Sequence, residues 1–92
     1  MNKKQFLTYE QLKELIELGL PYSLAPTYQQ AFDFIREKFG YNYFIREFIK
    51  GKYTFFIEKW EYKYYESDFT IPYEEARTRC LDKLIEIINN DK

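Results

Sequence analysis

The side chains that commonly perform catalysis are scarce in this chain. It contains no His, one Cys (Cys80) and two Ser (Ser23 and Ser67). A thiol or hydroxyl needs a neighbouring base or cation before it becomes a nucleophile, and no imidazole is present to supply one. Cys80 also falls within an apolar stripe at helical spacing, where it is expected to be a small core residue. The sequence therefore predicts a protein that is not an enzyme.

Metal and cofactor sites are not expected either. Without His, the candidate ligands are carboxylates, such as the pairs Glu58 with Glu61 and Glu66 with Asp68. Carboxylates around a hairpin are usually solvated, and the three dispersed glycines form no phosphate-binding loop. Acid–base chemistry by paired carboxylates stays open, although nothing in the sequence singles out a pair.

Aromatic residues are the unusual feature of the composition. Ten Tyr, nine Phe and one Trp make up 20 of the 92 residues. Rings of this size can build the core of a small domain, with tyrosine tips in water. The alternative is an exposed patch of rings that binds a partner or stacks on bases.

The charge is unevenly distributed along the chain. Net charge is −1, but residues 34–63 carry seven basic and four acidic residues, whereas residues 64–92 carry four basic and seven acidic residues. The middle segment is therefore the more basic one. We expect contacts with a protein partner at Arg46, Trp60, Tyr62 and Tyr64. The alternative is binding of single-stranded nucleic acid through Lys50, Lys52 and Lys59.

Two helices are predicted in the first half of the chain. Thr8 and Gln11 form a capping box for a helix over about 9–18, which Gly19 ends. Its apolar face, Leu12, Leu15 and Ile16, is a further candidate contact surface. Thr27 caps a second helix that ends at Gly40.

A hairpin and a third helix are predicted in the second half. Residues 41–49 and 53–60 are rich in Tyr, Phe and Ile, and Gly51 suits the turn between them. Residues 61–69 either continue the second strand or form a third. A helix begins near Pro72 and ends at residues 89–90, with Tyr73 at the start of its apolar stripe.

These elements predict a single α+β domain over residues 1–92, ordered over about 8–89. The order is α-α-β-β-(β)-α, with two helices across one face of an antiparallel hairpin. In the second strand Phe55 and Ile57 share one face, and Phe56, Trp60, Tyr62 and Tyr64 share the other. The predicted core comprises Phe34, Ile35, Ile45, Phe55, Ile57, Cys80, Leu84 and Ile87.

The predicted compartment is the cytoplasm. The N-terminal residues are polar and lack the apolar segment of a signal peptide, and no stretch is long and apolar enough to span a membrane. A single cysteine allows no disulfide within the chain, which fits a reducing environment.

Two blocks carry a resemblance to a known group of proteins. They are Ala25-Pro26-Thr27-Tyr28-Gln29-Gln30 and Tyr73-Glu74-Glu75-Ala76. With Gly19 before them, they make residues 8–88 resemble a family of small uncharacterised proteins borne by phages and prophages of Bacteroides and related gut bacteria. Pro72 stands where that family usually has a capping Thr. The resemblance implies an α+β fold and a bacterial host cell, and it implies no activity.

The expected function follows mainly by exclusion. We expect a non-catalytic phage or prophage accessory protein that binds another protein, for which a host protein is one candidate. Rings on both hairpin faces also predict that the chain associates as a homodimer. The alternative is single-strand nucleic-acid binding by the aromatic and basic hairpin face. Double-stranded RNA binding is disfavoured, because Glu74 and Glu75 stand where such domains place cations.

Overall fold

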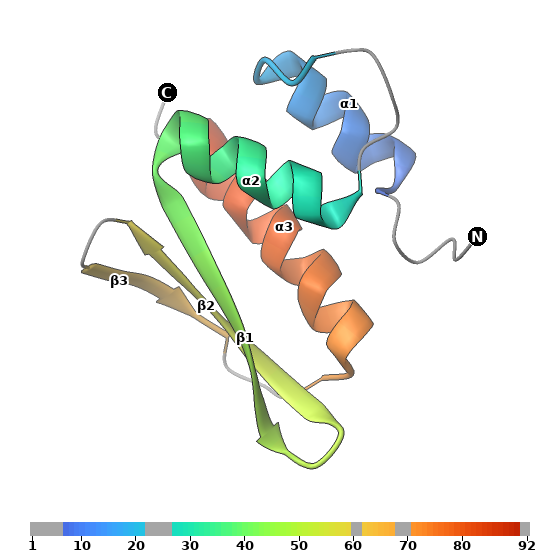
Figure 1. Ribbon diagram of the computed structural model, residues 1–92, viewed down its shortest axis with the longest axis vertical. Coiled ribbons are helices and arrows are strands. Elements are labelled where there is room, and N and C mark those ends of the chain that lie inside the picture. Colours follow the sequence, from blue (N-terminus) through green and yellow to red (C-terminus); the bar gives the residue numbers. More distant parts are fainter. Residues whose placement is uncertain (1–6, 22–26, 60–61, 68–70, 91–92) are drawn as a thin grey trace.

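The computed structural model describes residues 7–21, 27–59, 62–67 and 71–90. They form a mixed α+β fold of three helices and a three-stranded antiparallel sheet. The elements in chain order are α1 (Tyr9–Glu17), α2 (Tyr28–Phe39), β1 (Tyr41–Ile49), β2 (Lys52–Lys59), β3 (Tyr62–Glu66) and α3 (Tyr73–Asn90) (Figure 1). The α+β prediction is confirmed, and within residues 61–69 a third strand forms over the described residues 62–66.

The helix boundaries follow from local chemistry. Thr8 and Thr27 each accept a hydrogen bond from the backbone N–H three residues later, at Gln11 and Gln30. Both glutamine side chains bond back to the capping residue, so each helix begins with a complete capping box. Gly40 ends α2 in the left-handed conformation with φ of 82°.

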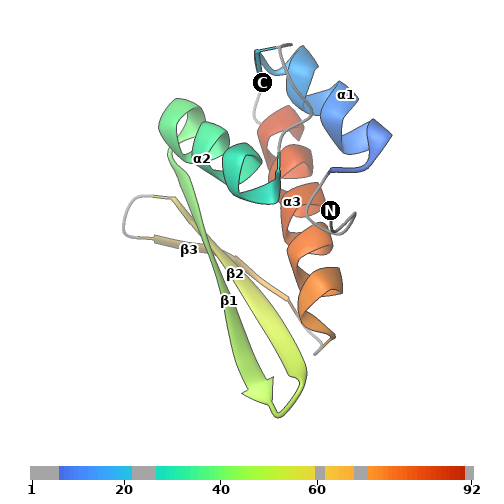
Figure 2. The same ribbon diagram turned by 45° about the vertical axis from the view of Figure 1, so that its right-hand side comes forward.

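The sheet has the strand order β1-β2-β3, with both pairs antiparallel. In the β1–β2 hairpin Tyr43 lies opposite Ile57 and Phe44 opposite Phe56. Gly51 supplies the positive φ of 80° that the connecting turn requires. The turn end of this hairpin projects beyond the helices in both ribbon views (Figures 1 and 2).

Helices α2 and α3 pack on one face of the sheet (Figure 2). Strand alternation directs Phe55 and Ile57 into this layer, where both are buried. The remaining buried apolar residues of the core cluster are Leu15, Leu18, Tyr28, Ala31, Phe32, Ile35, Tyr41, Cys80, Leu81, Leu84, Ile85, Ile87 and Ile88.

Four predictions about the core and its surroundings need correction. Phe34 and Ile45 pack against the core but are only partly buried. Phe34 lies at the margin of α2, where its ring meets Phe39 edge-on at 6.1 Å. Tyr73, in the first turn of α3, is 42% exposed. Leu15, predicted as part of a contact surface, is fully buried because α1 packs against α3.

Candidate functional site

The face of the hairpin that points away from α2 and α3 is the first candidate. The side chains on this face belong to the strand positions that alternate with the buried Phe55 and Ile57. Phe44 on this face is 53% exposed. We call this surface the open face and define it by Asn42, Phe44, Arg46, Thr54, Phe56 and Glu58.

A shallow depression of about 520 Å³ lies on the open face. Phe44, Arg46, Phe56 and Glu58 line it, together with Ile45. The Arg46 guanidinium carbon stands 5.7 Å from the centre of the Phe56 ring, a cation–π distance. The surface therefore combines apolar rings with a cation that is positioned by one of them.

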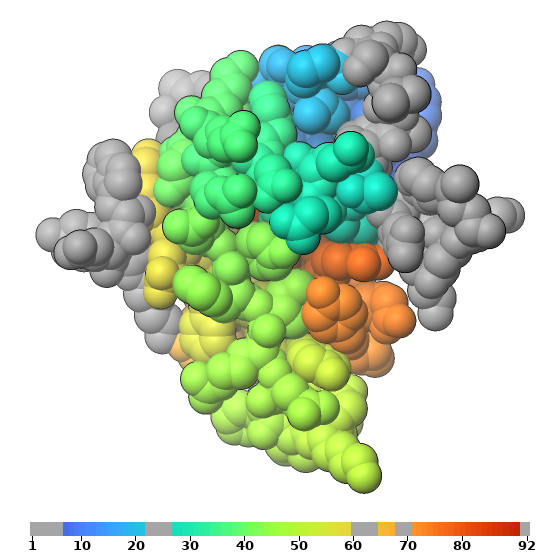
Figure 3. Space-filling model, viewed as in Figure 1, coloured from blue at the N-terminus to red at the C-terminus, as the bar shows by residue number. Residues whose placement is uncertain are grey.

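The projecting end of the hairpin extends this apolar surface. Phe48 and Ile49 are 62% and 56% exposed, and Lys50 and Lys52 flank the turn. Within the turn the Gly51 N–H donates to Glu47 Oε2 at 3.1 Å. We call residues 48–52 the hairpin tip; they form part of the protrusion at the bottom of Figure 3.

Of the four residues predicted to contact a protein partner, the structure describes the side chain of one. Arg46 lies on the open face. Trp60 lies outside the described residues. Tyr62 and Tyr64 belong to β3, but their side chains also lie outside what the structure describes.

The lysines of the nucleic-acid alternative divide between two surfaces. Lys50 and Lys52 belong to the hairpin tip. Lys59 is the strand partner of Tyr41, on the helix-covered side, with its ammonium 4.9 Å from the centre of that ring. Tyr43 also faces the helices and stacks on Phe32 at 3.8 Å. Lys59 and Tyr43 are therefore separated from the open face by the sheet.

Two tyrosines of the hairpin have a raised pKa. Burial is the main cause that raises the pKa of Tyr43 above its ordinary value. The Glu47 carboxylate, which also hydrogen-bonds the phenol, is the main cause that raises the pKa of Tyr53. Both shifts favour the neutral phenol, so neither tyrosine is prepared for proton transfer near neutral pH.

Within the described residues, the thiol and the serine hydroxyl that could act as nucleophiles both belong to buried residues. Cys80 is fully buried, and burial raises the pKa of its thiol, which disfavours the reactive thiolate. Ser67 Oγ accepts a hydrogen bond from the Phe55 N–H at 3.1 Å. Among the described residues, no group of three or more His, Cys, Asp or Glu side chains is arranged to hold a metal ion.

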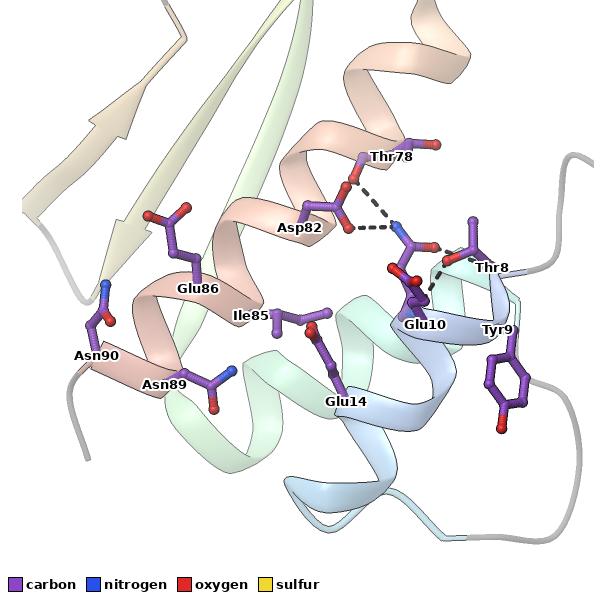
Figure 4. Close-up of a pocket in the computed structure, with 11 residues that line it drawn as sticks. Thr8, Tyr9, Glu10, Glu14, Thr78, Asp82, Ile85, Glu86, Asn89 and Asn90 are labelled. Carbon is purple, nitrogen blue, oxygen red and sulfur yellow. Dashed lines mark hydrogen bonds between the residues drawn. The ribbon is translucent and has the colours of Figure 1, made fainter.

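A second depression, of about 820 Å³, lies between α1 and α3. Glu10 and Glu14 of α1 and Asp82 and Glu86 of α3 surround it (Figure 4). Carboxylates grouped in this way are usually solvated, and no second feature of this depression points to a ligand.

Gln11 forms the inner wall of that depression and joins three helices. Its amide nitrogen donates to Asp82 Oδ1 at 2.9 Å, and its oxygen accepts from the Tyr28 hydroxyl at 3.1 Å. The same oxygen accepts from the Thr8 N–H at 3.0 Å. The Tyr28 hydroxyl also lies 2.8 Å from Thr78 Oγ1. This buried polar network holds α1 against α2 and α3.

Sequence reasoning missed the exposed apolar residues of the hairpin, Phe44, Phe48 and Ile49. For Phe44 and Phe48 the signal was the alternation relative to Tyr43 and Ile45, which share the face that meets the helices. Ile49 follows the register shift after Glu47, which alternation alone does not indicate. Sequence reasoning also assigned Gln11 to the capping box alone. No local pattern indicates that its amide nitrogen reaches a helix 71 residues later in the chain.

Comparisons with known proteins add no relatives: no family model, no curated protein and no solved structure matches this chain. Among the described residues, no helix has the length and apolar character needed to cross a membrane.

Proposed function

We propose that this protein is a non-catalytic accessory protein of a phage or prophage. In this proposal it acts in the cytoplasm of its bacterial host by binding another protein through the open face and the hairpin tip. One observation carries the proposal: Phe44, Phe48 and Ile49 are each more than half exposed on one projecting hairpin. Aromatic and arginine side chains supply much of the energy at protein interfaces, and here Arg46 stands beside them.

The charges of this region indicate the chemistry of the partner. Arg46, Lys50 and Lys52 outnumber Glu47 along the hairpin end. A partner surface that combines apolar residues with carboxylates would complement it. The phage or prophage origin rests on the resemblance of the two sequence blocks.

Capture from a host lysate treated with nuclease tests the proposal. We expect the wild-type chain to capture a specific protein. The amount captured should fall at least about tenfold with Phe48→Ser and with Arg46→Ala. Tyr9→Ser is the matched control, because Tyr9 is 79% exposed on α1, away from the hairpin. Equal loss with Tyr9→Ser would argue against the open face.

Single-strand nucleic-acid binding is the rival, because Arg46, Lys50 and Lys52 lie beside exposed rings. Binding of that kind weakens steeply as salt is added, since counterions are released from the phosphates. In a parallel capture from lysate without nuclease, recovery of nucleic acid alone, lost when Lys50, Lys52 and Lys59 are neutralised, would overturn the protein-partner proposal. Within the rival mode, neutralising Lys59 alone should have the smallest effect, because it lies on the helix-covered side.

A further inference from the structure

The two edges of the sheet differ in length and regularity. β1 forms one edge with nine residues, and β3 forms the other with five. The β2–β3 register also shifts between Ile57 and Glu58. Short or bulged edge strands discourage further pairing, whereas a long edge strand offers backbone groups to another strand. β1 is therefore the edge that is better suited to association.

Hydrogen bonds on the far side of β2 define which way its backbone groups point. Tyr53 exchanges two backbone bonds with Ile71, of 2.7 and 2.9 Å, and the Phe55 carbonyl accepts from the Ser67 N–H at 3.0 Å. The bonded backbone groups of Tyr53 and Phe55 therefore point away from β1. Because the direction alternates along an antiparallel strand, the intervening residues of β2 direct their N–H and C=O groups toward β1.

The same alternation fixes the outer edge of β1. The backbone N–H and C=O groups of Phe56 point toward β1, so Phe56 and its strand partner Phe44 form a hydrogen-bonded pair. The neighbours Tyr43 and Ile45 consequently direct their N–H and C=O groups outward. Within the described part of the chain, β1 pairs with β2 alone, so these groups have no strand beside them.

We propose that two copies of this chain pair through the outer edge of β1. The two strands run antiparallel about a two-fold axis at Phe44 and produce a continuous six-stranded sheet. Tyr43 of each copy then exchanges backbone hydrogen bonds with Ile45 of the other. Such an interface is isologous, so it closes at a dimer.

The exposed Phe44 ring supports this register. At the axis the two Phe44 residues form a non-hydrogen-bonded pair, the position in which opposite side chains lie closest. Each ring already lies opposite Phe56 in its own sheet. The dimer therefore places four aromatic rings in a row across the open face and covers part of each exposed Phe44.

Charge and strand regularity select the same register. Pairing about Phe44 uses residues 41–47, which precede the β1–β2 register shift between Glu47 and Ile49. It sets Arg46 opposite Asn42 of the second copy. Moving the axis to Arg46 would place two guanidinium groups opposite each other, a destabilising arrangement.

The dimer does not rest on the protein partner proposed above, because it forms through the edge of β1 and is measured on the purified chain alone, although it covers part of Phe44 on the open face. Sedimentation velocity over about 1–100 µM tests it. We expect a concentration-dependent dimer for the wild-type chain and a monomer for Phe44→Lys, which sets two ammonium groups at the axis. Phe48→Lys is the matched control: it adds the same charge at a similarly exposed ring but falls outside the paired segment, so the dimer persists. A wild-type monomer over the whole range would overturn the proposal.

A disulfide tests the register directly. Opposite residues in a non-hydrogen-bonded pair have Cα atoms about 4.5 Å apart, which is within the range that a disulfide accepts. We expect Phe44→Cys to form a covalent dimer under mild oxidation, and Phe48→Cys to form far less. The native Cys80 is buried and does not compete. Preferential cross-linking through Phe48→Cys would overturn the register centred on Phe44.

Discussion

The two faces of the β1–β2 hairpin use the same kinds of residue for different purposes. On one face Phe55 and Ile57 are buried against α2 and α3. On the other, Phe44 and Phe56 line a shallow depression, and Phe44 is more than half exposed. Residue type therefore does not distinguish a core side chain from a contact side chain in this protein. Position in the two-residue alternation, together with the helices that cover one face, makes the distinction.

The largest difference between the faces is expected in stability. Ile57→Ala should lower the free energy of unfolding by roughly 3 kcal/mol, because it leaves a cavity in the core between the sheet and the helices. Phe44→Ala should lower it by less than about 1 kcal/mol, through loss of a cross-strand pair. Urea denaturation at low protein concentration measures both while excluding the dimer. Equal losses would mean that the two faces are buried alike.

The polar network at Gln11 should have the next largest effect. Gln11→Leu preserves approximate volume but removes the partners of Asp82 and the Thr8 N–H, so we expect a loss of about 2 kcal/mol. Gln29→Leu is the control, because Gln29 bonds Asp33 at the exposed surface of α2. That change should cost less than about 0.5 kcal/mol. A comparable loss for both variants in urea denaturation would contradict a special role for the buried amide.

The N-terminal cap of α2 should contribute about 1 kcal/mol to the free energy of unfolding. Thr27→Ala removes the hydroxyl that accepts from the Gln30 N–H at 3.3 Å. Thr27→Ser retains the hydroxyl and should preserve most of the stability. Thermal unfolding followed by circular dichroism measures both variants, and equal destabilisation would indicate that the cap is energetically unimportant.

The smallest predicted effect concerns Tyr43, which packs on the helix-covered face. Its pKa is raised in the folded state, so above the unfolded value of about 10 the folded chain holds more protons than the unfolded chain. Its contribution to stability is fully present below that pH and is lost as the pH rises through the folded pKa. Tyr43→Phe should therefore flatten the alkaline decline in stability.

Urea denaturation between about pH 9 and 11 measures this slope. Tyr9→Phe is the control, because its ring is exposed on α1, away from the hairpin. An unchanged slope for Tyr43→Phe would show that burial of this phenol has no consequence for stability.

Local sequence determined the helix starts, the turn and six of the eight residues predicted for the core. Thr8, Thr27, Gly40 and Gly51 act through hydrogen bonds and backbone angles within a few residues, so their effects are readable from spacing. Period-2 alternation likewise identified Phe55 and Ile57 as core. These features depend on covalent neighbours and need no knowledge of distant segments.

The tertiary structure alone decided which side of the hairpin is covered and which strand lies at an edge. Tyr43 and Phe44 are adjacent and chemically similar, yet only Tyr43 meets Phe32 of α2. The buried network of Gln11 also required α1 to meet a helix far along the chain. Burial and pairing depend on which distant segments pack together, and one sequence read by itself carries no direct measure of those long-range contacts.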